Sequence, residues 1–84
     1  MRLLMQQPPL AGEIPRFFQL ILQQDLLGGW TLTRESGQIG GKTQWKREVY
    51  LEQQAATAAF EKARDQQLKR GFLVMFAQGA EAPR

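Results

Sequence analysis

Cationic and aromatic side chains gather in one stretch of the sequence, from Arg34 to Arg47. Lys42, Trp45 and Lys46 lie within this stretch, next to several glycines. Lysine and arginine hold phosphate groups, and an exposed indole stacks on a base or a sugar. These residue types therefore favour recognition of nucleic acid as the chemistry of this stretch.

A plainer interpretation of the same residues stays open. Trp45 and Trp30 could both lie at the edge of a hydrophobic core, with the cations as ordinary surface charge. The net charge of +3 permits an anionic partner but is too small to require one.

The segment SGQIGGKT, residues 36–43, is close to the phosphate-loop pattern G-x-x-x-x-G-K-[ST] and differs at Ser36. A phosphate loop must open a helix, whose N-terminus holds the phosphates. The residues that follow, TQWKREVY, alternate as a strand does. We therefore interpret the segment as a hairpin turn.

The composition argues against catalysis. The chain has no cysteine and no histidine, and its eight acidic residues are scattered among basic ones. Thiolate chemistry, the usual zinc ligands and the side chain best suited to proton transfer are thus missing. We expect no catalytic residues, no metal and no cofactor, and hence a protein that binds rather than an enzyme.

The length of 84 residues suits one domain. No apolar run approaches the roughly 20 residues of a membrane-spanning helix. We expect a soluble, cytoplasmic protein that does not interact with membranes.

Hydrophobic periodicity predicts the secondary structure. Residues 16–24, 30–35 and 43–50 alternate with a period of two, and glycine-rich segments separate them, as in an antiparallel meander of three strands. Residues 52–70 lack glycine and proline and place Ala56, Phe60 and Ala63 on one face, as in an amphipathic helix. Residues 72–76, FLVMF, predict a further short strand.

The predicted fold class is α+β, a small antiparallel sheet with one helix packed across it. Pro8, Pro9 and Pro15 suggest that residues 1–15 form a flexible arm. The domain would then span residues 16–76, and residues 77–84 would be a disordered tail.

As a set, residues 16–72 resemble the WGR domain. The resemblance lies in the opening R-F-F, in D-L-L-G-G-W-T-L, in the x-x-G-x-I-G turn, in A-x-x-x-F-E-K on the helix and in the closing K-R-G-F. It implies an antiparallel sheet crossed by a helix. In poly(ADP-ribose) polymerases such a domain binds DNA near strand breaks, and small stand-alone bacterial proteins also carry it. This chain is similar to the stand-alone type.

The chain departs from the family at the tripeptide that names it. That tripeptide falls on Ser36, Gly37 and Gln38, so the stacking tryptophan and the phosphate-binding arginine are absent. The resemblance therefore implies a retained fold with a contact to DNA ends that is weakened or lost. The residues that we expect to bind nucleic acid are Arg34, Gln38, Lys42, Trp45, Lys46 and Arg47.

A protein adaptor without nucleic-acid binding is the alternative function. It would expose an apolar patch such as residues 73–76. If this last strand is a free sheet edge, weak self-association should follow.

Overall fold

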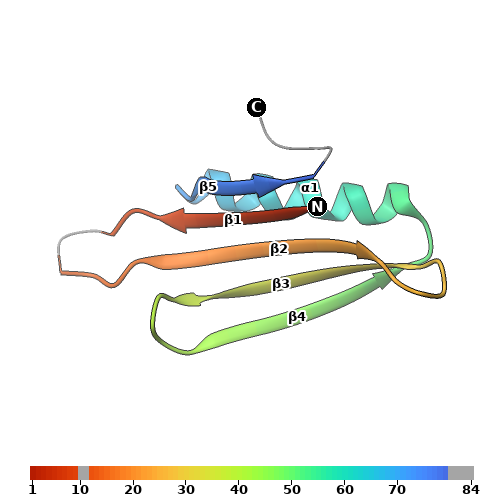
Figure 1. Ribbon diagram of the computed structural model, residues 1–84. Coiled ribbons are helices and arrows are strands. Elements are labelled where there is room, and N and C mark those ends of the chain that lie inside the picture. Colours follow the sequence, from red (N-terminus) through yellow and green to blue (C-terminus); the bar gives the residue numbers. More distant parts are fainter. Residues whose placement is uncertain (10–11, 80–84) are drawn as a thin grey trace.

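The computed structural model describes residues 1–9 and 12–79. Five strands and one helix make up these residues: β1 (Arg2–Gln7), β2 (Arg16–Gln24), β3 (Trp30–Gln38), β4 (Thr43–Tyr50), α1 (Gln53–Lys69) and β5 (Leu73–Gln78). The strands form one antiparallel sheet in the order β4-β3-β2-β1-β5, and α1 lies across one face of it (Figure 1). The predicted α+β class and the meander β2-β3-β4 are confirmed.

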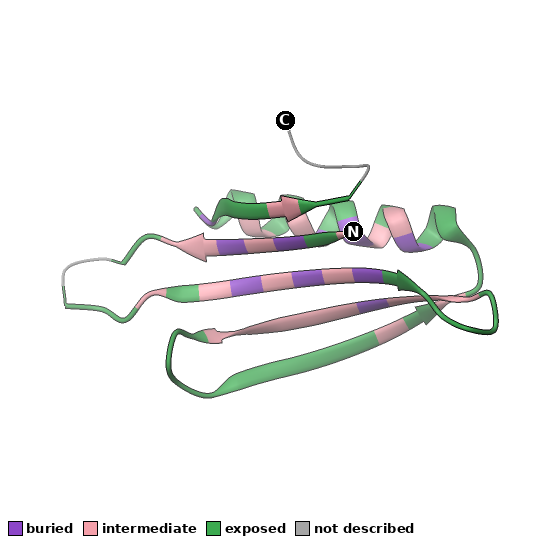
Figure 2. Cartoon of the chain, in the orientation of Figure 1, coloured by how far each residue is buried: buried purple, intermediate pink, exposed green. Residues whose placement is uncertain are grey.

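The core lies between α1 and the middle of the sheet. Along β2 the side chains of Phe18, Leu20 and Leu22 are buried, and the residues between them are not, so β1 and β2 show alternating burial in Figure 2. Leu32 of β3 joins them from the neighbouring strand. Alternation places apolar side chains on one face because successive residues of a strand point to opposite sides.

The helix buries a narrow stripe of small residues around one large one. Ala56, Phe60 and Ala63 are its buried residues, and the alanines allow a close approach to the sheet. At its C-terminus the N–H of Phe72 donates to the carbonyl of Gln67 at 3.0 Å. Gly71 adopts a φ of +91° there, as the Schellman ending of a helix requires.

The prediction of a flexible arm over residues 1–15 is wrong for residues 2–7, which form β1. Leu3 pairs with Leu20 and Met5 with Phe18, and the Leu3 and Met5 side chains are fully buried. The prolines that suggested an arm follow this strand instead of interrupting it. The strand is stabilised by burial of its two inward side chains and by pairing on both sides.

Smaller differences concern element ends. β3 continues to Gln38, beyond the predicted end at residue 35, and the turn that follows is correspondingly shorter. The helix begins and ends one residue inside the predicted range 52–70. β5 runs to Gln78 and pairs with β1, so it does not border the meander directly. Residues 77 and 78 of the predicted tail therefore belong to β5, and its residues 80–84 lie outside the described residues.

The first prediction concerns the single large side chain of the helix stripe. Replacing Phe60 by Ala should lower the free energy of unfolding by about 3 to 5 kcal/mol, because it empties the centre of the core. Glu61→Ala, on the exposed side of the same turn, should change it by less than about 0.5 kcal/mol. Urea denaturation measures both values. Equal stabilities for the two variants would show that another helix face meets the sheet.

The second prediction tests β1. Met5→Ala should lower the free energy of unfolding by about 2 to 5 kcal/mol. Met5 is 0% exposed, so the shorter side chain would leave a cavity in the core. Gln6→Ala, on the opposite face of the same strand, is the matched control and should stay near the parent. Thermal melting of both variants checks this. A loose N-terminal segment would instead make both substitutions silent.

Candidate nucleic-acid interface

A cleft opens on the helix side of the sheet, between the turn that joins β3 to β4 and the C-terminal end of α1. Its volume is about 820 Å³. Phe18 and Phe72 line its inner part and lie edge to face, with ring centroids 6.5 Å apart. The opening to solvent makes this a surface groove with an apolar floor.

The polar lining of this cleft is positively charged. It includes the cations Arg16, Lys42 and Arg70, and none of the described residues that line it carries a carboxylate. Neither of the two ion pairs among the described residues involves these three cations. Their charge is therefore free to act on an anion from solvent.

Uncharged polar groups complete the lining. They are the hydroxyl of Ser36 and the amides of Gln7, Gln38, Gln44 and Gln67. Such groups donate hydrogen bonds to phosphate and sugar oxygens in many protein–DNA contacts. The lining thus combines the two kinds of group that hold a sugar-phosphate backbone.

Strand register and the helix end bring the cations together. Arg16 begins β2 and pairs with Gln38 at the end of β3, so the two side chains lie on the same face. Arg70 is the C-cap of α1, and its carbonyl accepts a 2.9 Å hydrogen bond from the side-chain amide of Gln7. This bond ties the end of the helix to β1, which fixes one wall of the cleft.

The tripeptide Ser36-Gly37-Gln38 forms part of the opposite wall. Ser36, Gly37 and Gln38 all line the cleft, although the alternation of β3 would direct a side chain at position 37 toward the other face. A Cβ on Gly37 would clash with the carbonyl oxygen of Lys42. Glycine is therefore required by the close approach of β4. The positive φ of the turn, +79°, falls on Gly40 instead.

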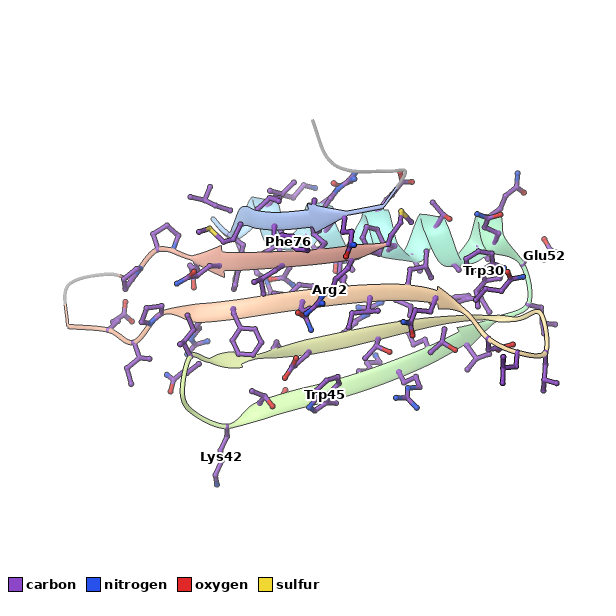
Figure 3. The ribbon with its side chains drawn as sticks, viewed as in Figure 1. Arg2, Trp30, Lys42, Trp45, Glu52 and Phe76 are labelled. Carbon is purple, nitrogen blue, oxygen red and sulfur yellow. The ribbon has the colours of Figure 1, made fainter. Side chains whose placement is uncertain are left out.

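The structure separates the six residues predicted to bind nucleic acid. Gln38 and Lys42 line the cleft, and Lys46 is exposed further along the helix side of β4. Trp45 and Arg47 alternate with Lys46 and so lie on the opposite face, which is uncovered and faces the viewer in Figure 3.

Arg34 is engaged elsewhere. Its guanidinium donates to Glu48 of β4 at 2.7 Å, and both side chains are partly buried. The carboxylate of Glu48 neutralises the positive charge of Arg34, which would otherwise attract a phosphate. Arg34 consequently stabilises the β3–β4 pairing rather than offering a free cation.

The two tryptophans have different environments. Trp30 pairs with Tyr50 and packs against the core, as the plainer interpretation expected. The side chain of Trp45 is 61% exposed, and with Thr33, Lys46 and Arg47 it borders a shallow hollow of about 450 Å³. Trp45 is therefore available for stacking, but away from the cleft.

Arg16 and Arg70 are the cleft residues that sequence reasoning missed. The sequence pattern places Arg16 only at the start of a strand and Arg70 only at the end of a helix. The alternation of the second strand does place Arg16 on the same face as Phe18, which was the one available signal. Nothing local connects either residue with Lys42.

The comparisons with known proteins identify the family. No curated protein and no solved structure matches the chain significantly. Within residues 1–9 and 12–79, no helix is long and apolar enough to cross a membrane. The family model of the WGR domain, a binding domain rather than a catalytic one, matches residues 1–76. That range includes β1 and extends to within two residues of the end of β5. With this match and the sheet-and-helix fold, the chain belongs to the WGR domain family.

Proposed function

We propose that the chain is a non-catalytic module that binds duplex DNA by its sugar-phosphate backbone, in the cleft between the β3–β4 turn and the end of α1. The observation that carries the proposal is the set of three cations, Arg16, Lys42 and Arg70, with no carboxylate among the described lining residues. Lys46 on the same side of the sheet extends the positive surface. Membership of a nucleic-acid-binding family supports the same conclusion.

The expected binding is weak and independent of sequence. Phosphate contacts position a protein on DNA but carry no base information. Ser36 and Gln38 stand where the family tripeptide has a stacking ring and a cation, so these two positions add no preference for unstacked nucleotides. Duplex interiors and duplex ends should accordingly bind alike. A cytoplasmic location remains an expectation that accompanies this function.

A protein adaptor is the second candidate, favoured by the exposed apolar side chains of residues 73–76. These residues lie on β5, outside the lining of the cleft. A partner bound there would leave the cations of the cleft free, so experiments on the cleft separate the two functions.

The third prediction assigns the DNA contacts to one face. Three phosphate contacts give a slope of log affinity against log salt of about −2.7, and each lost contact flattens it by about 0.9. Arg16→Gln, Lys42→Gln and Arg70→Gln should each flatten the slope by one such step. Fluorescence anisotropy of a labelled duplex at several salt concentrations measures it.

Arg47→Gln is the matched control, since it removes one charge from the opposite face and should leave the slope unchanged. If Arg47→Gln flattens the slope and the three cleft variants do not, the DNA interface lies on the uncovered face instead. Absence of any salt-dependent binding by the parent would favour the adaptor.

The fourth prediction restores the family tripeptide through Ser36→Trp with Gln38→Arg. Both side chains would project into the cleft, where a stacking ring contributes about 1 to 3 kcal/mol on an unstacked nucleotide. Affinity for open duplex ends should therefore rise relative to a closed dumbbell duplex, as measured by competition.

Thr31→Trp with Thr33→Arg adds the same side chains at the same spacing on the uncovered face and should produce no preference for ends. The proposal for the cleft is contradicted if the parent already prefers ends about tenfold. It is also contradicted if the restored variant gains no more than this control.

A further inference from the structure

The two edges of the sheet differ in charge. The outward edges of β4 and β5 have no strand partner among the described residues, so each presents free backbone N–H and C=O groups. Lys46, Arg47 and Glu48 lie in succession on β4, and charged side chains on an edge oppose pairing with another strand. β5, with the sequence LVMFAQ, has neither charge nor proline. Only β5 is therefore chemically open to strand addition.

The side chains of β5 are apolar toward both faces of the sheet. Val74 pairs with Met5 on the helix side, and Phe76 pairs with Leu4 on the uncovered side. From Leu73 to Phe76 the exposed fractions are 55, 37, 58 and 47%. Four successive large apolar residues exposed on a free edge are the pattern that leads to edge-to-edge association.

We propose that β5 pairs antiparallel with β5 of a second copy of this chain, which joins two sheets into one continuous sheet. A two-fold axis perpendicular to the sheet at Met75 would bring residues 73–77 of the two copies together along the new boundary. All five residues are apolar, so no like charges meet there. A strand that is complementary to itself in this way suits a two-fold dimer.

The distribution of charge favours a second copy over a charged partner. β4 and β5 lie at opposite edges of the sheet (Figure 1). In the proposed dimer the exposed Lys46 and Arg47 of the two copies lie at the two far edges of the joined sheet, which keeps the repulsion between two cationic chains low. A partner recognised by its charge would find no counter-charge on β5 itself.

The dimer should be weak. The shared strand has 6 residues, so the interface falls below the roughly 1,200 to 2,000 Å² of stable complexes. The pairing of β5 with β1 also shifts register between Leu4 and Met5, which leaves Met75 as an extra residue. Such a bulge interrupts the regular ladder. Association should therefore appear between micromolar and millimolar protein, without DNA.

The test is sedimentation velocity over that concentration range, on the parent and on single variants. Met75→Lys places two like charges at the axis and should weaken association at least tenfold. Met75 is 58% exposed, so the fold should tolerate the change, as far-UV circular dichroism would verify. Val49→Lys makes a matched change at a 65% exposed residue of the other edge strand and should associate like the parent.

A charge-swap experiment separates pairing at β5 from general destabilisation. Met75→Lys and Met75→Glu should each be monomeric alone, and an equimolar mixture should recover a heterodimer through opposite charges at the axis. A parent that stays monomeric at millimolar concentration would overturn the proposal. Persistence of the Met75→Lys dimer, loss of association in Val49→Lys, or failure of the mixture to associate would do the same.

Discussion

β1 pairs with a strand on each side and buries its inward side chains against the core. The remaining elements depend on these contacts. It pairs with β2 along its whole length and with β5 on the other side. Leu3 and Met5 are buried in the core, and the amide of Gln7 binds the last carbonyl of the helix cap. Without β1 the sheet would lose β5, and the wall of the cleft that holds Arg70 would lose its attachment. The short N-terminal strand thus links the hydrophobic core to the geometry of the candidate interface.

The sheet divides the charges of the chain between two environments. On the helix side, cations from three separate elements converge on a cleft free of carboxylates among its described lining residues. On the uncovered side, the guanidinium of Arg2 donates a hydrogen bond to the side chain of Gln19, whose amide donates one to Glu35. Both hydrogen bonds are 3.3 Å long. This row of polar contacts crosses three strands and balances charge internally. An anion would accordingly meet a more favourable potential in the cleft than over the centre of the uncovered face.

Local patterns were sufficient to predict the meander, the helix and the fold class, because each depends on periodicity within one segment. β1 was missed because its stability comes from β2 and β5, and the second of these lies near the other end of the chain. The same limit applies to the site. Arg16 and Arg70 approach Lys42 through strand register and helix length, which no spacing in the sequence encodes. Alternation along β4, in contrast, already separates Lys46 from Arg47.

The pairing of Leu3 with Ala77 also affects the order in which the strands fold and unfold. The meander and the helix connect neighbouring segments, whereas β1 and β5 must close a loop that contains nearly the whole described chain. The entropic cost of closure grows with the logarithm of loop length, and contacts between distant residues slow folding. We expect β5 to join the sheet last and to detach first, so that its amides exchange hydrogen faster than those of β2. The edge that is open to a second copy would then also be the place where the native domain begins to unfold.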